Sequence, residues 1–329
     1  MKSWNILKKT KKANGRRHIY LFGVKVFSYK KKNKSSLNDK YANSSDFNFK
    51  TYTDLSNDII KNLYKIPDNI DLVVGIPRSG MIPAYMIGFL RNLPVCSLNE
   101  FMAGNLKRDG ERKIKEITEE KLNILVIDDS CSSGRAMCRA RQAVGNLSEK
   151  HNIMYMAVYV LPGSEHYIDI YAEVVPNPRM FQWNYLNHPN IEQCCFDIDG
   201  VLCYDPTPEQ NDDGQEYIRF LETARPKYIP KYKIGALVTS RLEKYRKHTE
   251  DWLKKNNISY NKLYMLNLPS KEERIRLNAH ASFKSEVFAK KGLVFYESEP
   301  KQAEEIALKT GKPVICTENN TLYYKKMIK

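Results

Sequence analysis

The sequence has little that would place the chain in a membrane or in a disulfide-bonded scaffold. Its longest nearly apolar run covers residues 81–90, far short of the roughly 20 residues that cross a bilayer. No apolar segment follows the basic start of the chain, so we expect no secretory signal. The seven cysteines form neither a CxxC pair nor a Cys/His zinc pattern, and their number is odd. We therefore expect a reduced, cytoplasmic protein.

Acidic residues are nearly missing from the first 50 positions. This segment holds twelve lysines and two arginines but only two aspartates, so it carries +12 of the net charge of +15. We interpret residues 1–50 as a basic arm and linker, in which the alternation at 18–29 predicts a hairpin or a short pair of strands. Such an arm suits an anionic surface, such as the inner face of a membrane, and a solvated tail is an equal alternative. We expect no stable nucleic acid partner.

From residue 51 onward, apolar strands alternate with helical patterns, which predicts parallel sheets covered by helices. In the first part we expect strands at 71–76, 122–127 and 153–161, helices at 54–64, 81–90 and 134–147, and a long mobile loop at 99–121. In the second part we expect strands at 194–198, 234–238, 263–265, 293–296 and 313–316. The fold class is therefore α/β, with two Rossmann-like domains at 51–190 and 191–329.

The most specific segment of the first domain is ILVIDDSCSSGRAM at 124–137. An apolar strand leads to two adjacent carboxylates, then to a loop of small hydroxylic residues and to a helix. Carboxylates accept hydrogen bonds from the vicinal hydroxyls of ribose, and backbone N–H groups at the start of a helix bind phosphate. This order of elements outweighs the alternative, a generic corner with a solvated pair of aspartates. The expected ribose-phosphate site comprises Asp128, Asp129, Ser130, Cys131, Ser132, Ser133 and Gly134.

This segment resembles the 5-phosphoribosyl-1-pyrophosphate (PRPP) signature of type I phosphoribosyltransferases, with serines at 132 and 133 where threonine is common. In that family an earlier loop contacts the pyrophosphate and its Mg²⁺. The segment VVGIPRSG at 73–80 is similar to that loop, which implies that Arg78 and Ser79 bind PRPP.

The same resemblance implies two further parts of the first site. A mobile loop would close over the substrate, and its expected cations are Lys107, Arg108, Arg112 and Lys113. The segment PNPRMFQWNY at 176–185 is similar to the part that reads the acceptor. There, Trp183 is expected either to stack on a base or sugar or, as the more favoured alternative, to belong to the core.

The segment FDIDGVLC at 196–203 is the strongest motif in the chain. An apolar strand delivers Asp197, and Asp199 follows two residues later. One carboxylate can attack phosphorus to form an aspartyl-phosphate, and a second acid can protonate the leaving oxygen and then activate water. The spacing resembles the first motif of the haloacid dehalogenase (HAD) superfamily of phosphatases. The resemblance implies that Asp197 is the nucleophile, that Asp199 is the acid/base, and that both bind Mg²⁺, Asp199 through its carbonyl.

The later motifs of that superfamily have counterparts in order. The strand of IGALVTS at 234–240 ends in Thr239, the expected phosphate-binding hydroxyl, with Ser240 as the alternate. The expected lysine is Lys284, with Lys271 as runner-up. The expected Mg²⁺ ligand in LVFYESEP at 293–300 is Glu297, with Glu299 second. The forty residues between Asp199 and Thr239 leave little room for a cap domain, so we expect a capless phosphatase with an open site.

The two motif sets together resemble the dual-domain ribofuranosyltransferases of bacterial surface-polysaccharide assembly. The resemblance implies that 5-phosphoribose passes from PRPP to a glycan hydroxyl with inversion, and that the 5-phosphate is then hydrolysed. The implied partners are PRPP and a lipid-linked glycan acceptor, with Mg²⁺ as cofactor and the basic arm near the membrane. Three alternatives remain: a nucleobase salvage enzyme fused to a phosphatase, a PRPP-sensing RNA-binding regulator, and two domains with unrelated substrates.

Overall fold

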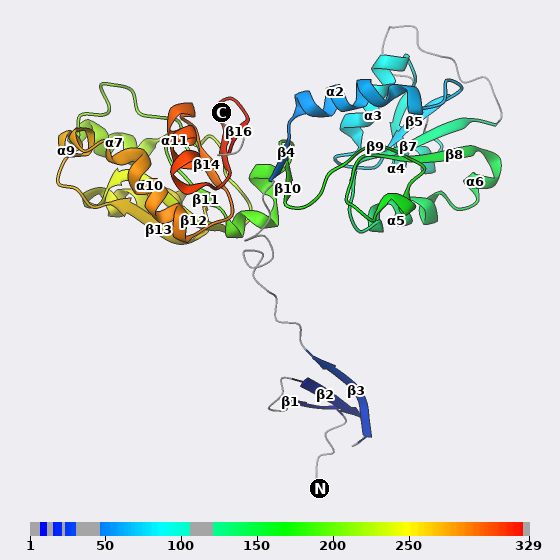
Figure 1. Ribbon diagram of the computed structural model, residues 1–329, viewed down its shortest axis with the longest axis horizontal. Helices are drawn as coiled ribbons and strands as arrows, with labels where there is room; N and C mark the ends of the chain where they lie inside the picture. Colours follow the sequence, from blue (N-terminus) through cyan, green and yellow to red (C-terminus); the bar gives the residue numbers. More distant parts are fainter. Residues whose placement is uncertain (1–6, 12–15, 22–23, 31–46, 106–120, 325–329) are drawn as a thin grey trace. The chain divides into compact units, whose positions relative to one another are not determined.

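The computed structural model describes residues 7–11, 16–21, 24–30, 47–105 and 121–324. The chain divides into two units, Met1–Ser45 and Asp46–Lys329. The first unit contains a three-stranded antiparallel sheet in the order β1 (Leu7–Lys11), β2 (Arg16–Leu21) and β3 (Val24–Lys30) (Figure 1). Strands β2 and β3 pair across the segment in which the alternation predicts strands.

The second unit begins with a five-stranded, fully parallel sheet in the order β6-β5-β7-β8-β9. Its strands are β5 (Leu72–Gly75), β6 (Val95–Ser97), β7 (Asn123–Cys131), β8 (Asn152–Val160) and β9 (Ile170–Val174). Its helices are α2 (Tyr52–Asn62), η1 (Leu63–Lys65), α3 (Met81–Arg91), α4 (Leu98–Met102), α5 (Arg135–Val144), α6 (Leu147–Lys150) and η2 (Glu165–Tyr167). The middle of β7 is completely buried, as expected for a parallel strand with helices on both faces.

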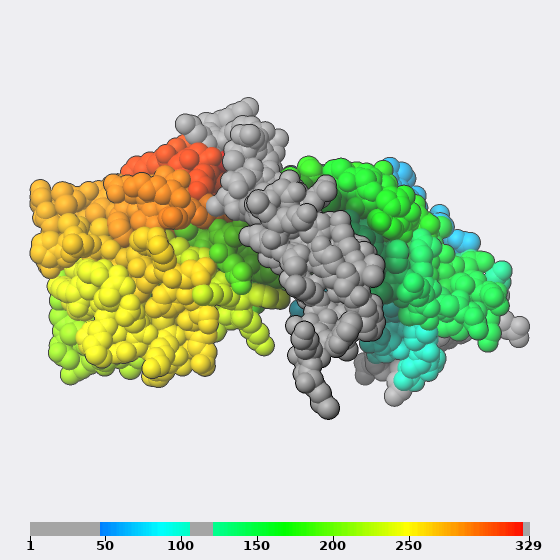
Figure 2. Space-filling model, turned by 90° about the horizontal axis from the view of Figure 1, so that it is seen from below, coloured from blue at the N-terminus to red at the C-terminus, as the bar shows by residue number. Residues whose placement is uncertain are grey.

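A second sheet of six strands follows in the order β13-β12-β11-β14-β15-β16, parallel except for the last strand. Its strands are β11 (Cys195–Phe196), β12 (Ile234–Leu242), β13 (Tyr260–Leu266), β14 (Phe295–Glu297), β15 (Val314–Cys316) and β16 (Thr321–Tyr323). Its helices are α7 (Gln215–Thr223), η5 (Glu243–Tyr245), α8 (Arg246–Lys255), α9 (Lys271–Arg276), α10 (Ala279–Lys290) and α11 (Pro300–Thr310). In the space-filling view, the surface of these strands and helices is coloured from yellow-green to red (Figure 2).

A short parallel pair, β4 (Asn48–Lys50) and β10 (Arg179–Phe181), lies outside both large sheets. Side chains alternate along a strand, and β10 uses both of its faces. Met180 belongs to the same apolar cluster as the second sheet, whereas Phe181 belongs to a cluster of the first. The 3-10 helices η3 (Tyr185–Asn187) and η4 (Pro189–Gln193) lead from β10 to β11. The domain boundary near residue 190 stays a prediction, and β10 contributes to both cores.

The α/β class with parallel sheets is confirmed, and two local predictions are corrected. The strand expected at 122–127 continues to Cys131 because β8 pairs with β7 over that whole length. The loop expected at 99–121 begins with α4, which a capping box of Ser97 and Glu100 stabilises. The short edge strands β6, β9 and β16 were not predicted, because their sequences have no strong apolar pattern. In the described parts of the chain, no helix is long and apolar enough to span a bilayer.

The burial of β7 predicts a large stability difference between two leucines of the same region. Leu125 is fully buried in β7, whereas Leu90 is half exposed on α3. Leu125→Ala should lower the free energy of unfolding by about 2–5 kcal/mol because it leaves a cavity. Leu90→Ala should change it by about 0.5 kcal/mol or less. Urea denaturation followed by circular dichroism measures both values, and equal losses would contradict the assigned core.

Candidate functional site

The first acidic site lies where the strand order of the five-stranded sheet reverses. Strand β5 lies between β6 and β7, so the loops after β5 and β7 meet at the carboxyl edge of the sheet. In open α/β sheets, ligands bind at this position. The Ser79 hydroxyl donates to Asp129 Oδ1 at 2.8 Å and joins the two loops. A Cβ at Gly80 would lie 2.6 Å from the carbonyl oxygens of Ile76 and Ile127, so only glycine permits this approach.

The two adjacent carboxylates of the first site are both buried at the end of β7. The backbone N–H of Asp129 donates to Asp128 Oδ1 at 2.9 Å. Burial, with the nearby charge of Asp129, raises the pKa of Asp128 to about 8. A carboxyl group in this state can donate a hydrogen bond as well as accept one. The pair therefore suits hydroxyl groups, which both donate and accept.

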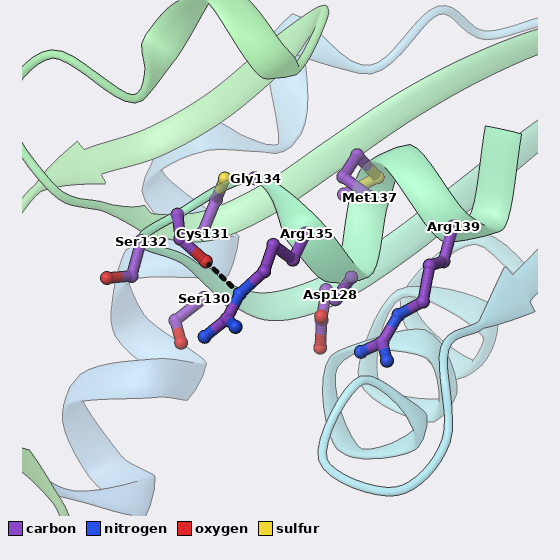
Figure 3. Close-up of a pocket in the computed structure, with 10 residues that line it drawn as sticks. Asp128, Ser130, Cys131, Ser132, Gly134, Arg135, Met137 and Arg139 are labelled. Atoms are coloured by element: carbon purple, nitrogen blue, oxygen red, sulfur yellow. Dashed lines mark hydrogen bonds between the residues drawn. The ribbon is translucent and has the colours of Figure 1, made fainter. Parts of the chain in front are cut away.

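A cavity of about 450 Å³ extends from Asp128 along the loop 130–134 to the first turns of α5. It includes the expected loop residues, Ser130, Cys131, Ser132, Ser133 and Gly134. Gly134 has a positive φ of 68°, and a Cβ there would collide with the ring of Tyr167. The structure adds two exposed cations that sequence reasoning missed, Arg135 and Arg139. Their side chains extend toward the side of the cavity on which the Asp128 carboxylate lies (Figure 3).

Trp183 lies against the acid pair, a contact that no local sequence signal could reveal. Its indole N–H donates to Asp129 Oδ2 at 2.6 Å. Its ring is half-buried and stacks on Phe181 at 4.9 Å between centroids, and this pair continues to Tyr159. Trp183 thus packs against the core and also fixes the second carboxylate. With Ser79 and Trp183 as donors, both oxygens of Asp129 are engaged.

The remaining residues expected in the first site are less constrained. Arg78 is exposed in the loop after β5, three residues before Met81, the first residue of α3. The four cations expected on the closing loop, at 107, 108, 112 and 113, lie outside the described residues.

The second acidic site is assembled from three adjacent strands of the six-stranded sheet. Asp197 follows β11, Thr239 lies near the end of β12, and Glu297 ends β14. Because these strands are parallel neighbours, their carboxyl ends share one edge. Lys284 enters from α10 and donates to Asp197 Oδ2 at 2.6 Å, to Glu297 Oε2 at 2.7 Å and to the side chain of Gln302 at 3.0 Å. The structure thus brings together four residues that the sequence separates by up to 100 positions.

Electrostatic compensation holds this cluster in the core. Burial alone would lower the pKa of Lys284, but the charges of Asp197 and Glu297 outweigh it and raise the pKa above its ordinary value. Burial raises the pKa of Asp197 to about 7, although the positive charge of Lys284 opposes this rise. All three side chains are almost completely inaccessible to solvent. The lysine is therefore the counter-ion of two carboxylates as well as the expected phosphate ligand.

Asp199 is bound by Arg241, a residue that the sequence analysis did not select. Arg241 is buried, and its guanidinium donates to Asp199 Oδ2 at 3.0 Å and to Oδ1 at 2.6 Å. Burial would raise the pKa of Asp199, but the bidentate arginine outweighs it and holds the pKa below its ordinary value. In this arrangement Asp199 is an ionised carboxylate, so it can act as a base. To donate a proton, Asp199 must first exchange its contact with Arg241 for a proton. Its position directly after the Thr239–Ser240 pair marks it as close to the site but does not identify Asp199 as its partner.

The two alternates of the sequence analysis have other roles in the structure. Lys271 begins α9, and its ammonium donates to the carbonyl of Asn211. Glu299 caps α11, where its carboxylate accepts from the backbone N–H groups of Lys301 and Gln302 at 3.0 and 2.7 Å. The geometry therefore favours Lys284 over Lys271 as the lysine of the site, and Glu297 over Glu299 as its acid.

The donor set of the second site fits Mg²⁺ in its chemistry. Among the described residues, no group of three or more Asp, Glu, His or Cys side chains gathers around one point. However, Asp197 and Glu297 contact the same ammonium, and the carbonyl of Asp199 faces only a long 3.4 Å contact from Ser298. Mg²⁺ is bound by one or two carboxylates and other oxygen atoms, with water completing its shell. Asp197, Glu297 and the Asp199 carbonyl are thus the residues that would hold it.

Comparisons with known proteins give a partial likeness in structure. No protein-family model matches the chain, and no curated protein matches it in sequence. Solved structures that match include xanthine-guanine-hypoxanthine phosphoribosyltransferase of Helicobacter pylori, with 17% identity over 42% of this chain and 93% of that one, at a TM-score of 0.32. Purine phosphoribosyltransferase of Pyrococcus horikoshii matches with 18% identity over the same shares, at 0.32. Orotate phosphoribosyltransferase of Aeropyrum pernix matches with 11% identity over 48% and 75%, at 0.25.

The lysine between two buried carboxylates predicts a specific stability loss. Lys284→Met should lower the free energy of unfolding by about 3–5 kcal/mol, because Asp197 and Glu297 would keep their burial and lose their counter-ion. Lys309→Met removes a surface pair with Glu305 and should cost about 1 kcal/mol or less. Urea denaturation at pH 7 measures both, and a Lys284→Met variant as stable as Lys309→Met would show that the cluster is not a compensated ion pair.

The pKa of Asp128 predicts a pH-dependent stability. The folded-state pKa of about 8 lies above the ordinary value of 3.8, so the group adds stability at low pH. This stability is lost as the pH rises from about 4 to about 8, because only the unfolded chain then releases the proton. Between pH 5 and pH 8, the wild type should therefore lose stability relative to Asp128→Asn.

Denaturation midpoints at pH 5, 6.5 and 8 measure this difference. The matched control is Asp251→Asn, which removes an exposed carboxylate of α8 and should show no such trend above pH 5. A difference between wild type and Asp128→Asn that stays constant with pH would contradict the raised pKa.

Proposed function

We propose that the chain is a bifunctional ribofuranosyltransferase of surface polysaccharide (O-antigen or capsule) assembly. The first site transfers 5-phosphoribose from PRPP to a glycan hydroxyl. The second site, a phosphatase of the HAD type, hydrolyses the 5-phosphate of the product. The observation that carries the proposal is the presence in one chain of two cavities that each contain buried carboxylates at the carboxyl edge of a sheet.

The residues around the first cavity support the transfer step. Backbone N–H groups of loop 130–134 and the start of α5 suit the 5-phosphate, because a helix N-terminus with small hydroxylic residues favours an anion. The acid pair Asp128 and Asp129 suits the ribose hydroxyls, and Arg78 is free to approach the pyrophosphate from the loop after β5. The acceptor oxygen forms a bond to C1, the bond from C1 to pyrophosphate breaks, and the acceptor proton passes to a general base, for which Asp128 and Asp129 are the nearest carboxylates. Because PRPP is the α anomer, this displacement gives a β-ribofuranoside.

The residues around the second cavity support hydrolysis of a phosphate monoester. The carboxylate of Asp197 attacks phosphorus, the bond to the sugar oxygen breaks, and that oxygen receives a proton from Asp199. For this step Asp199 must first exchange its contact with Arg241 for a proton. Water then attacks the aspartyl-phosphate, gives its proton to Asp199, and releases phosphate. A bound Mg²⁺ would offset the repulsion between the carboxylate and the anionic phosphate. Thr239 lies near the end of β12 and lines the same cavity as Asp197, and in this proposal its hydroxyl donates a hydrogen bond to the phosphate.

In this proposal the product of the first step is the substrate of the second. The product of the first step still carries a 5-phosphate, which is the ester that the second step removes. The net result is the delivery of an unphosphorylated ribofuranosyl group. In this proposal the basic arm at 1–50 holds the enzyme near a lipid-linked acceptor at the anionic inner membrane face.

The proposal predicts a product that differs by one phosphate between two enzyme variants. Asp197→Asn removes the nucleophile of the phosphatase and leaves the first site unchanged. With Mg²⁺, PRPP and a lipid-linked glycan extract, it should produce a glycan heavier by pentose plus phosphate. The wild type and the matched surface variant Asp251→Asn should add pentose alone. Mass spectrometry of the products distinguishes the two.

Parallel incubations with nucleobases test the salvage alternative. Nucleotide formed from a base, with no change in any glycan, would replace the proposal with a base phosphoribosyltransferase joined to a phosphatase. Pentose phosphate that accumulates equally with wild type and Asp197→Asn would refute the phosphatase half alone.

A further inference from the structure

The second cavity contains two buried polar groups that have no partner in the protein. This cavity measures about 510 Å³ and is lined by Asp197, Thr239, Ser240, Arg274 and Lys284, among others. Within the described ranges, the buried side-chain nitrogen and oxygen atoms without a hydrogen bond are Ser240 Oγ and Arg274 Nε. Ser240 is 7% exposed and Arg274 is 8% exposed. Buried polar atoms are nearly always hydrogen-bonded, so this corner of the cavity is built for an additional group.

The arginine has donors to spare, whereas the lysine has none. An ammonium has three N–H groups, and those of Lys284 are directed to Asp197, Glu297 and Gln302. A guanidinium has five N–H groups, and Arg274 uses one of them, from Nη1 to the carbonyl of Ser240 at 2.7 Å. Arg274 is therefore the cation on the cavity wall that can bind a ligand without giving up a protein partner.

The charge of Arg274 is also uncompensated by the surrounding side chains. In the described part of the chain it forms no ion pair with a carboxylate. His280, which also lines the cavity, cannot supply one, because an imidazole is either neutral or positively charged. Burial, together with the charges of Arg274 and Lys284, lowers the pKa of His280 to about 4, so it is neutral at pH 7. A buried cation without a counter-ion is costly, and an anion in the cavity would remove that cost.

We infer that Arg274 and Ser240 bind the non-bridging oxygens of the phosphoryl group that Asp197 attacks. The guanidinium Nε–H and the Ser240 hydroxyl act as fixed donors to these oxygens, and their interaction with the phosphoryl group strengthens as charge develops during transfer. This inference rests on the proposed phosphatase function. It assigns the recognition of phosphate to an arginine of α9, and it leaves Lys284 as the counter-ion of Asp197 and Glu297.

The first test is hydrolysis of 4-nitrophenyl phosphate with Mg²⁺, a substrate whose one anionic group is the phosphoryl group itself. Arg274→Gln should lower kcat/KM by about 100-fold or more, as expected for the loss of a charged donor to the transition state. Ser240→Ala should lower it by about 10-fold. The matched control is Arg276→Gln, which changes an exposed arginine of the same helix that pairs with Glu273 at the surface.

Arg276→Gln should stay within twofold of the wild type. Thermal unfolding should show that Arg274→Gln is folded, because the change removes an uncompensated charge. An unchanged kcat/KM in both Arg274→Gln and Ser240→Ala would overturn the inference while the phosphatase proposal stands. So would a loss confined to ribose 5-phosphate derivatives that carry a second anionic group, since Arg274 would then bind that group.

A second measurement separates this inference from the proposed function. Calorimetric titration of the wild type with inorganic phosphate should show binding that Arg274→Gln weakens at least tenfold and that Arg276→Gln leaves unchanged. If the wild type hydrolyses no phosphate ester, the proposed phosphatase fails, but this binding result still supports the anion site. Equal phosphate binding by wild type and Arg274→Gln, or none by either, would overturn the site itself.

Discussion

The parallel pairing of neighbouring strands is the constraint on which both acidic sites depend. Phe196 of β11 pairs with Tyr296 of β14, so the next residue on each strand, Asp197 and Glu297, reaches the same edge of the sheet. The backbone N–H of Asp197 donates to the carbonyl of Tyr296 at 3.0 Å and continues that register into the site. In the first sheet, the pairing of Gly75 with Ile127 likewise brings the loop after β5 to the acid pair. Neither site would form if one strand were shifted by a residue, because alternate residues face opposite sides.

The two sites stabilise buried acidic groups by different means. In the second site, cations compensate the carboxylates: Lys284 contacts Asp197 and Glu297, and Arg241 contacts Asp199. In the first site, Asp128 keeps a proton at neutral pH because burial raises its pKa, and neutral donors hold Asp129. The first arrangement suits a polyhydroxyl ligand that exchanges hydrogen bonds. The second arrangement is a network of ion pairs beside Arg274, whose free donors suit the proposed anion.

The segment from β10 to η3 supports both sites at once. Phe181 and Trp183 stack in the core of the first sheet, and the Trp183 indole holds Asp129. On the other face, Met180 and Tyr185 contact Tyr296, whose hydroxyl donates to the Tyr185 carbonyl at 2.9 Å. Tyr296 is the residue before Glu297 in β14. This short segment therefore contacts an acid of the first site directly and contacts the residue before an acid of the second site.

The amino-acid pattern alone predicts the α/β class, the main buried strands and the acids that follow them. Long apolar runs such as 124–127 predict buried strands without any knowledge of the fold. The acids that follow them lie next to each other at 128 and 129, and two residues apart at 197 and 199. The side chains that contact those acids are known only from the folded structure. Trp183 reaches Asp129 from 54 residues away, and Arg241 reaches Asp199 from 42. No local pattern encodes such contacts, because they depend on strand order and on which face of a strand or helix is buried. For the same reason Arg274 could not be selected from the sequence. Its importance depends on a buried N–H group that has no hydrogen-bond partner in the folded chain.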